Sequence, residues 1–387
     1  MSTPADFQNE IYLAGLGDVL PGFPTDLTKL EDAARDVLSA RAFGYVAGSA
    51  GSERTARFNR EAFDRWRIVP RLLRDVSVRD LSVEVFGQRM PAPVLLAPLG
   101  VQSILHADGE RATARAAAAL GLTSVLSTAS STALEDVAEA AGTGPRWYQL
   151  YWPKSRELAA SLVARAEAAG YQALVVTLDT FTLAWRPRDL DGAYLPFLRA
   201  VGVQNYFSDP VFQAMVGGPV TDANRDAALL TWVGQFGNPA LTWDDLAWLR
   251  ERWSGPIVLK GVQHPDDARR AAAAGMDGVV VSNHGGRQVD GAVASLDALP
   301  VVAEAVGDRL TVLFDSGIRT GSDVIKALAL GARAVLVGRP FAYGLALGGE
   351  AGVRHVLRSL LADLDLTLAL AGLTGPGDLG PDTLVRA

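Results

Sequence analysis

Short apolar runs alternate with alanine-rich stretches along most of the chain. Eight of these runs are rich in β-branched residues and apolar at nearly every position, as in strands buried on both faces of a parallel sheet. They cover residues 93–98, 124–128, 146–152, 173–179, 257–261, 278–284, 311–317 and 334–339. The pattern therefore predicts eight parallel strands.

Helical stretches separate the runs, and most of them end in Gly, the residue favoured just past a helix C-terminus. They cover residues 108–121, 131–141, 155–170, 265–275, 295–307 and 320–331. Ser155 and Thr320 are candidate N-caps. Strands that alternate with helices in this way predict an α/β fold, a single (β/α)8 TIM barrel. The alternative is an open doubly wound sheet, which the lack of a G-x-G-x-x-G motif after the first strand disfavours.

The fourth and fifth predicted strands are separated by much more chain than the other neighbours are. Residues 189–238 therefore form a long insertion that contains aromatic residues, Gly and Pro. A lid over the barrel mouth is one interpretation of this segment, and a surface or oligomer-contact insertion is the other.

The whole chain, 1–387, is predicted to form a single domain around this barrel. Its parts are an N-terminal extension, the barrel with its insertion, and a C-terminal helix and tail, at 1–92, 93–345 and 346–387. In the extension, residues 27–43 predict an amphipathic helix and residues 83–88 a short hairpin over the barrel bottom. The C-terminal helix is predicted at 350–370.

Composition narrows the classes of function. The chain has 387 residues and no Cys, which excludes a disulfide framework, a thiolate metal site and a cysteine nucleophile. Its four His residues fall in no metal-ligand spacing, so we expect no metal. A net charge of −7 argues against nucleic-acid binding through a general basic field. The first 20 residues contain three acidic and no basic residues, and no apolar run is long enough to span a bilayer. We expect a cytoplasmic protein with no nucleic-acid or membrane partner.

Polar and charged residues gather where the predicted strands end, and the carboxyl ends of barrel strands carry active sites. Packing does not explain a Lys, a His and several Arg there, so we expect an active site on this face. Only four of the 36 basic residues are Lys, which makes Lys260, in an apolar strand, a candidate for a specific role. The seventh and eighth strands each end in a Gly with an Arg, Gly317 with Arg319 and Gly338 with Arg339. Together these residues predict one phosphate site. Tight turns with surface arginines are the alternative.

His284 is the candidate general base, because imidazole titrates near neutral pH. Arg287, three residues further on, can bind a carboxylate in a fork geometry. Asp179, at the end of the fourth strand, can orient His284 and stabilise its protonated form. A structural role is the alternative for a lone His, and the other three His residues fit that alternative.

These strand ends closely resemble the FMN-dependent α-hydroxy-acid oxidases and dehydrogenases, over nearly the whole chain. The marks are Ser-Asn-His-Gly-Gly-Arg-Gln at 282–288, Lys-Gly at 260–261, Gln-Leu-Tyr at 149–151, Asp-Ser-Gly-Ile-Arg at 315–319 and Gly-Arg-Pro at 338–340. Within the family, the chain is most similar to the actinobacterial lactate 2-monooxygenase branch. That similarity rests on the long insertion, on Gly100 and on segments 8–12, 45–48, 185–190, 196–199, 205–206, 209–213 and 263–268. Trp152 and residues 181–184 and 191–194 depart from that branch and leave the substrate side chain open.

The resemblance implies FMN as cofactor and an L-2-hydroxy acid as substrate. His284 would start the oxidation of the substrate, Asp179 would pair with His284, and Tyr151 would hydrogen-bond the substrate hydroxyl. The substrate carboxylate would be held by Tyr45, Arg186 and Arg287. The resemblance also implies a homo-oligomer, either a tetramer or an octamer.

The cofactor-binding residues are implied by the same resemblance. Lys260 would lie beside N1 and O2 of the flavin and stabilise its anionic reduced form, a fixed charge placed where negative charge develops. The isoalloxazine ring would contact Ala97, Pro98, Leu99, Gly100, Ser127, Gln149, Thr177 and Ser282. The ribityl chain and phosphate would contact Asp315, Ser316, Gly317, Arg319, Gly338 and Arg339.

The resemblance favours an L-lactate 2-monooxygenase, which converts lactate and O2 to acetate, CO2 and H2O. The alternative within the family is an oxidase that releases the 2-keto acid and H2O2. A dehydrogenase that passes electrons to a quinone or a cytochrome fits less well, because the sequence contains no membrane segment or haem domain. Another class, an FMN-binding barrel isomerase or a non-redox flavin protein, would not need His284, Arg287 and Asp179 together. In the monooxygenase, the insertion would delay release of the keto acid and Gly100 would leave it room beside the flavin.

Overall fold

The computed structural model describes residues 3–387; Met1 and Ser2, at the start of the expected N-terminal extension, lie outside the described residues. Eight parallel strands close into a barrel in chain order, and the last strand completes the ring by pairing with the first. The strands are β4 (Val94–Leu96), β5 (Ser124–Ser127), β6 (Arg146–Leu150), β7 (Leu174–Thr177), β8 (Ile257–Val262), β9 (Gly278–Val281), β10 (Thr311–Phe314) and β11 (Ala334–Val337). All eight overlap the predicted apolar runs, so the (β/α)8 prediction is confirmed and the open sheet is wrong.

Apolar side chains fill the inside of the barrel, among them Leu95, Trp147 and Leu313. A hairpin of β2 (Val83–Val85) and β3 (Gln88–Met90) closes one end. Its Phe86 packs on Trp147 and on Gly278, which lie at the amino ends of their strands. The predicted hairpin therefore covers the barrel bottom, and the polar strand ends lie at the opposite face.

Helices surround the barrel and overlap the predicted alanine-rich stretches. They are α5 (Gly109–Ala119), α6 (Leu134–Ala141), α7 (Arg156–Ala168), α13 (Pro265–Ala273), α14 (Ser295–Val306) and α15 (Gly321–Ala329). The side chains of Ser155 and Thr320 accept hydrogen bonds from the first turns of α7 and α15, as predicted for N-caps. The helix α12 (Asp245–Arg250) precedes β8. The long α16 (Arg339–Leu370) follows β11 and breaks at Gly348 and Gly349, so that its second part is the predicted C-terminal helix.

The single amphipathic helix predicted over residues 27–43 is wrong. The chain forms a 3₁₀ turn at Leu27–Lys29, then α2 (Leu30–Val37) and α3 (Ala40–Ala47). The break lies at Ser39, whose backbone is extended and whose hydroxyl caps the first turn of α3. A Ser side chain can take a backbone N–H that would otherwise continue a helix, and the pattern of apolar positions does not show this effect. The break allows α2 to pack on α16 while α3 leads to the barrel mouth.

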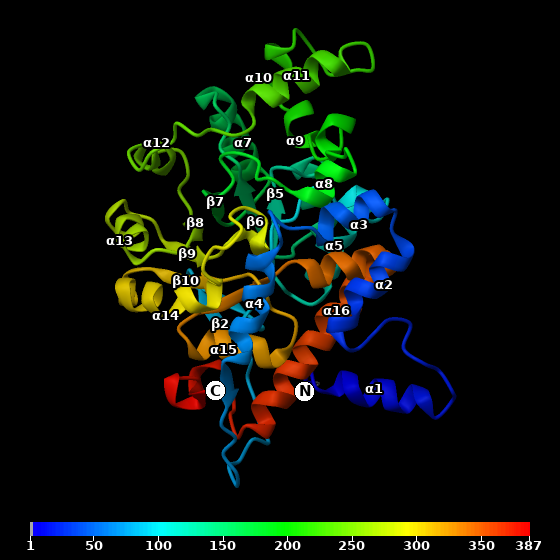
Figure 1. Cartoon of the computed structure of the whole chain (residues 1–387), viewed down its shortest axis with the longest axis vertical. Coiled ribbons are helices and arrows are strands. Elements are labelled where there is room, and N and C mark those ends of the chain that lie inside the picture. The colour runs from blue at the N-terminus through cyan, green and yellow to red at the C-terminus, as the bar shows by residue number, and fades with distance from the viewer. Residues whose placement is uncertain (1–2) are drawn as a thin grey trace.

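The remaining helices and strands are α1 (Asp6–Gly15), α4 (Arg54–Asp64), β1 (Trp66–Ile68) and β12 (Leu384–Arg386). In Figure 1, α1 lies low on the right and α4 lies near the middle of the view. The strand β1 pairs with β12, which joins the N-terminal extension to the C-terminal tail. None of the helices within residues 3–387 combines the length and apolar character needed to cross a bilayer.

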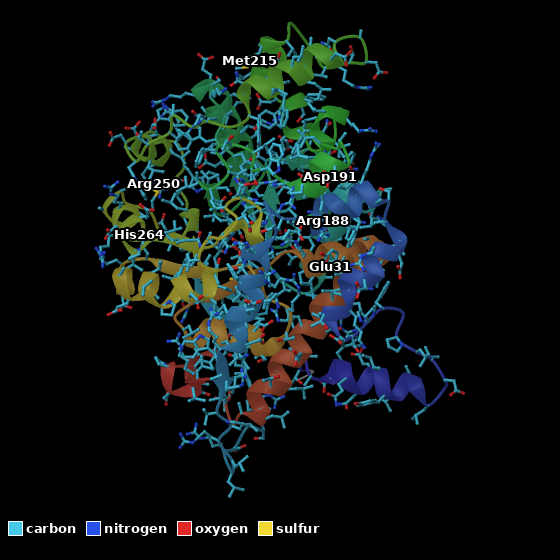
Figure 2. The ribbon with its side chains drawn as sticks, in the orientation of Figure 1. Glu31, Arg188, Asp191, Met215, Arg250 and His264 are labelled. Atoms are coloured by element: carbon cyan, nitrogen blue, oxygen red, sulfur yellow. The ribbon has the colours of Figure 1, made fainter. Side chains whose placement is uncertain are left out.

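The insertion after β7 is built largely of short helices. They are α8 (Pro187–Asp191), α9 (Gln204–Phe207), α10 (Pro210–Met215) and α11 (Arg225–Gln235), with a 3₁₀ turn at Pro196–Arg199. In Figure 1 this green segment forms the top of the molecule. Figure 2 shows Met215 at its outer end, whereas Arg188 and Asp191 lie lower, beside α3, which α8 contacts.

Buried polar side chains fix the inner part of the insertion to the barrel. The fully buried Asn205 accepts a hydrogen bond from the Leu134 N–H (2.8 Å) and donates to the Ser127 (3.3 Å) and Thr128 (3.1 Å) carbonyls. Asp209, also fully buried, caps α10 and pairs with Arg165 of α7 at 3.0 Å. This part of the insertion is therefore a fixed wall of the structure.

We predict that Asp209→Ala loosens this wall. The change leaves Arg165 without its buried partner and α10 without its N-cap, and breaking a buried ion pair costs about 3–5 kcal/mol. Urea unfolding and limited proteolysis within residues 196–238 measure the effect. The matched control is Asp222→Ala, which removes an exposed ion pair with Arg225 in the same insertion and should change stability by less than about 1 kcal/mol. Equal losses in the two variants would contradict the assignment.

Candidate active site

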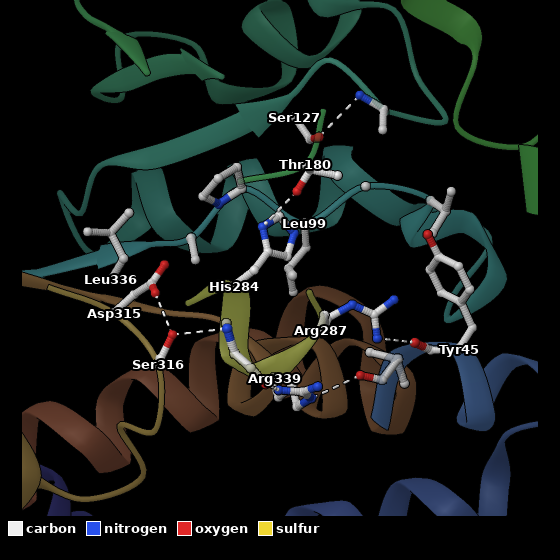
Figure 3. Close-up of a pocket in the computed structure, with 18 of the residues that line it drawn as sticks. Tyr45, Leu99, Ser127, Thr180, His284, Arg287, Asp315, Ser316, Leu336 and Arg339 are labelled. Atoms are coloured by element: carbon white, nitrogen blue, oxygen red, sulfur yellow. Dashed lines mark hydrogen bonds between the residues drawn. The ribbon is translucent and has the colours of Figure 1, made fainter. Parts of the chain in front are cut away.

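A pocket opens at the carboxyl ends of the barrel strands, and Figure 3 shows it with His284 near its centre. Most of the predicted site residues line it, namely Tyr45, Ala97, Pro98, Leu99, Gly100, Ser127, Tyr151, Arg186, Lys260, His284, Arg287, Asp315, Ser316, Gly317, Arg319, Gly338 and Arg339. Thr177 and Asp179 line a neighbouring pocket that shares Tyr151. Gln149 and Ser282 lie behind the lining, hydrogen-bonded to Ser127 and Lys260 respectively.

The loop after β9 holds His284 in an uncommon backbone conformation. His284 has φ 58°, and Gly285 and Gly286 follow with φ 65° and 82°. A non-glycine residue in the left-handed region costs free energy and persists only where neighbours fix it. Here the Ser282 hydroxyl accepts from the His284 N–H at 3.0 Å, and the Asn283 side chain accepts from the Gly286 N–H at 3.1 Å. The two glycines of the motif are thus required by the turn that presents the imidazole.

The imidazole of His284 joins two partners on opposite edges. Its Nδ1 lies 2.9 Å from Asp179 Oδ1 and 3.2 Å from the Thr180 hydroxyl, which also donates to Asp179. Its Nε2 lies 3.4 Å from the Tyr151 hydroxyl. An ionised carboxylate only accepts hydrogen bonds, so Nδ1 carries the proton and Nε2 is left as the proton acceptor.

The pKa directions agree with this assignment. Burial lowers the pKa of His284 below 6.5, although Asp179 acts to raise it. Burial acts to raise the pKa of Asp179, but the His284 and Lys260 charges bring it below its ordinary value. Burial raises the pKa of Tyr151 well above its ordinary value. At neutral pH the site therefore contains a carboxylate, a neutral imidazole and a phenol.

Lys260 lies within β8, two residues before its end; it is nearly fully buried and forms an ion pair with Asp315 at 2.8 Å. It also donates to the Ser282 hydroxyl at 3.0 Å. Asp315 in turn accepts from Ser316, whose hydroxyl accepts from the Gly285 N–H at 2.9 Å. Burial acts to lower the pKa of Lys260, but the nearby Asp315 and Asp179 raise it, so the ammonium stays charged. The network places a fixed cation in the pocket wall.

Two further guanidinium groups line the pocket near His284. Arg287 donates to the Tyr45 (2.7 Å) and Gly48 (2.6 Å) carbonyls, and its guanidinium lies 5.0 Å from the Tyr45 ring. Arg186 donates to the Arg287 carbonyl at 3.1 Å and to Gln288 at 2.7 Å. Burial, with Arg287 close by, lowers the pKa of Arg186 to about 10. These hydrogen bonds go to carbonyl and amide oxygens, so the positive charge remains available for an anionic ligand.

The two predicted phosphate arginines differ in their contacts. Arg339 donates to the Val46 (3.0 Å), Gly48 (2.9 Å) and Gly285 (2.9 Å) carbonyls and to the Ser49 hydroxyl (3.0 Å). It thereby ties the end of α3 to the His284 loop, a role that the sequence did not indicate. Arg319 donates from its side chain to the Ile318 carbonyl at 2.9 Å.

Glycines complete the predicted phosphate end of the pocket. Gly317 has φ 109°, and an added Cβ would lie 2.8 Å from the Asn59 carbonyl oxygen. Gly338 directly precedes the long α16, and no side chain caps that helix. The amino end of a helix carries partial positive charge and favours an anion, although here Pro340 has no N–H group and the Phe341 and Ala342 N–H groups donate to the Gly338 carbonyl.

Three buried polar atoms at the strand ends have no hydrogen-bond partner within residues 3–387. They are Gln149 Nε2, Thr177 Oγ1 and Asp179 Oδ2. The Ser127 hydroxyl donates to Gln149 Oε1 at 2.8 Å, which leaves the amide N–H groups of Gln149 free. Orphaned buried polar atoms in a native fold indicate a missing partner. A flat ligand with polar edges, such as the flavin ring, supplies one, so the residues present fit FMN.

The insertion contributes pocket residues that the sequence did not reveal. Phe197 and Phe236 line the pocket, and each ring stacks on Trp232 with centroids 4.9 Å apart, while the two Phe centroids lie 5.9 Å from each other. Phe236 also contacts the Tyr151 ring edge-on at 5.6 Å. Thr180 was missed as well, and its only signal was its position next to Asp179. The aromatic contacts join segments far apart in the sequence, so no local pattern reports them.

Gly100 lines the pocket as predicted, and the structure adds a second consequence of its missing side chain. An added Cβ would lie 2.6 Å from the Ala129 carbonyl oxygen and 2.8 Å from the Ala129 Cβ. The missing side chain therefore leaves room for the loop after β5, and room for the keto acid beside the flavin stays a prediction. The neighbouring Val101 donates its N–H to the same Ala129 carbonyl at 2.9 Å.

Thr177→Val should affect the empty and the flavin-loaded protein in opposite directions. Removing an orphaned buried hydroxyl should raise the free energy of unfolding of the flavin-free chain by about 1 kcal/mol, whereas flavin affinity should fall because a partner is lost. Urea unfolding and flavin fluorescence measure the two effects. The control for the unfolding measurement is Thr113→Val, which removes a buried hydroxyl bonded to Gln102 at 2.6 Å and should lower stability. A flavin affinity unchanged in Thr177→Val would contradict the fit.

Comparisons with known proteins agree with the geometry. The family profile described as FMN-dependent dehydrogenase matches residues 34–386. An FMN-dependent alpha-hydroxy acid dehydrogenase of Penicillium citrinum is 50% identical over 98% of this chain and 95% of its own length. An L-lactate oxidase of Lysinibacillus sphaericus is 44% identical over 94% of this chain and 93% of its own length. A crystal structure of mandelate oxidase with (S)-4-hydroxymandelic acid has a TM-score of 0.83 at 38% identity, and covers 94% of this chain and 99% of that chain.

Proposed function

This chain belongs to the FMN-dependent dehydrogenase family, and on that basis we propose that it oxidises L-lactate in a lactate 2-monooxygenase reaction. It is an FMN-dependent oxidoreductase of 2-hydroxy acids; the identity of the acid and the fate of the oxygen are the proposed part. One observation carries the proposal, namely the neutral His284 that Asp179 orients beside two guanidinium groups. A base next to a site for a carboxylate is the arrangement that a 2-hydroxy acid requires.

FMN supplies the two-electron acceptor for the substrate carbon when it is bound. We assign its phosphate to the end of the pocket formed by Gly317, Arg319, Gly338 and Arg339, and its ribityl chain to Asp315 with Ser316. The ring is assigned to Ser127, Gln149, Thr177 and Lys260, with Ser282 and the backbone of residues 97–100. The charged Lys260 places positive charge where the ring gains negative charge.

The substrate is proposed to bind through both of its polar groups. Arg287 and Arg186 attract the carboxylate, and the Tyr45 hydroxyl donates a hydrogen bond to it. The Tyr151 hydroxyl and His284 Nε2, 3.4 Å apart, both face the substrate hydroxyl. Oxidation removes two electrons and two hydrogens from the C–OH group, and Nε2 accepts the proton of the hydroxyl. The Asp179 carboxylate then stabilises the imidazolium, and burial by the insertion excludes water from this step.

The overall reaction of the monooxygenase is lactate plus O2 to acetate, CO2 and H2O, which requires the keto acid to stay bound while oxygen reacts. The aromatic wall formed by Phe197 and Phe236, with Trp232 packed against both, supports slow release of the keto acid. An oxidase that releases the keto acid and H2O2 is the second candidate, and the L-lactate oxidase relatives favour it. An FMN-binding isomerase or a non-redox flavin protein has no use for the His284–Asp179 pair.

The proposed partners are a small 2-hydroxy acid and O2, in a homo-oligomer of four or eight chains in the cytoplasm. The family resemblance supports the oligomer, and the acidic, cysteine-free composition supports the location. Chromatography with light scattering tests the first, and microscopy of a tagged chain in its host tests the second.

The proposal is tested by adding L-lactate to the FMN-loaded protein under anaerobic conditions. The flavin absorbance should bleach, and turnover in air should then give acetate and CO2. Pyruvate with H2O2 as the only products would make the enzyme an oxidase, and failure of every 2-hydroxy acid to bleach the flavin would refute the redox function. His284→Ala is the control: it should keep FMN but bleach at least about 10²–10⁴-fold more slowly, the contribution typical of a general base.

The pH dependence of flavin reduction should report His284. The imidazole must be neutral to accept a proton, and burial lowers the pKa of His284 below 6.5, so the acid limb of kcat/KM should have its midpoint below pH 6.5. The Asp179 carboxylate acts to raise that pKa, so Asp179→Asn should move the acid limb to still lower pH and reduce the plateau. Stopped-flow reduction across this range measures both, with the exposed Asp266→Asn as control. An acid limb that moves upward in Asp179→Asn would contradict the assignment.

A further inference from the structure

Glu110 is a fully buried carboxylate that the proposed chemistry does not use. It lies in the first turn of α5, is 1% exposed, and is not among the residues that line the pocket. Burial raises the pKa of Glu110 even though backbone hydrogen bonds act to lower it. Such a group is costly to bury, so its contacts must account for it.

The contacts of Glu110 join two loops. Its Oε1 accepts from the Gln102 N–H at 3.1 Å and from the Ser131 N–H at 2.9 Å, and its Oε2 lies 3.4 Å from the Thr132 hydroxyl. Gln102 belongs to the loop after β4, and Ser131 and Thr132 belong to the loop after β5. One oxygen atom thus holds backbone donors of both loops.

A second layer of hydrogen bonds extends this arrangement toward the pocket. The Gln102 side chain donates to the Leu99 carbonyl at 3.0 Å and accepts from the Thr113 hydroxyl at 2.6 Å. Val101, between them, has φ 54°, a strained conformation for a β-branched residue, and it donates its N–H to Ala129 of the other loop. Leu99, Val101 and Ala129 all line the pocket. The contacts of Glu110 therefore continue directly into the pocket wall.

We propose that Glu110 is a positioning residue for FMN, because its carboxylate fixes the loops after β4 and β5 in the arrangement that forms one wall of the flavin pocket. This inference rests on the proposed placement of the flavin against residues 97–100 and Ser127. Without the carboxylate, two backbone N–H groups lose their buried acceptor and the strained Val101 can relax. The pocket wall then loses its shape while the barrel stays folded.

The test compares four variants of the holoenzyme. Glu110→Leu fills the volume but accepts no hydrogen bond, and Glu110→Gln keeps an amide oxygen for both backbone donors. Thr113→Val removes the outer support of Gln102. Asp365→Leu is the matched control. Asp365 lies on α16 and is as buried as Glu110, but it binds Arg79 and the Ala5 N–H and does not line the pocket.

Two measurements report positioning. The first is the dissociation constant of FMN, obtained from the rise of flavin fluorescence when the holoenzyme is diluted. We expect about 10- to 100-fold weaker binding in Glu110→Leu, a smaller loss of about 3- to 10-fold in Thr113→Val, and a value within about 3-fold of wild type in Glu110→Gln. The second is amide hydrogen exchange, which should accelerate in residues 99–105 and 128–134 of Glu110→Leu and not in β8, β9 and β10.

The outcomes distinguish the positioning role of Glu110 from the proposed oxidation of a 2-hydroxy acid. FMN binding within about 3-fold of wild type in folded Glu110→Leu, or equal losses in Glu110→Leu and Asp365→Leu, would overturn the positioning role. If Glu110→Leu does not fold, rescue by Glu110→Gln together with a loss in Thr113→Val supports the role, and wild-type affinity in Thr113→Val overturns it. A wild-type protein that binds FMN but is not bleached by 2-hydroxy acids would refute the proposed reaction alone.

Discussion

The hydrogen bond between Asp179 and His284, 2.9 Å long and largely shielded from water, is the contact on which the rest of the site depends. It decides which ring nitrogen carries the proton and therefore which one can accept another. Its two ends come from the loops after β7 and β9, which only the closed barrel brings together. Placing His284 there requires a strained, left-handed backbone at His284 itself and two glycines directly after it.

The charged side chains around this pair differ in whether they have an oppositely charged partner. Lys260 is matched by Asp315, whereas Arg186 and Arg287 are bonded to neutral oxygens. The two guanidinium groups near His284 thus offer positive charge that suits a carboxylate. At the far end of the pocket, the uncapped start of α16 and Arg319 provide a second positive region for a phosphate. In the proposed assignment, one pocket therefore binds two anionic groups, the substrate carboxylate and the FMN phosphate.

Segments outside the barrel strands hold this pocket in shape. Arg339 and Arg287 fix the end of α3, which carries Tyr45, and Asn205 fixes the insertion to the carbonyls at the end of β5. Glu110 acts in the same way on the loops after β4 and β5. These side chains bond backbone groups, and through these contacts they shape the pocket wall. Rigid support of this kind is what a preformed site requires.

The sequence by itself determined the eight strands, the helices between them and the polar residues at the strand ends, because continuous apolar runs and helix caps are local patterns. It also singled out His284, Asp179, Lys260 and Arg287, since titratable groups after apolar strands are conspicuous. Only the tertiary structure decided the break at Ser39, the aromatic wall of the insertion, the true neighbour of Gly100 and the buried contacts of Glu110. Each of these depends on atoms from distant segments meeting at short range, and no periodicity along the chain records such a meeting.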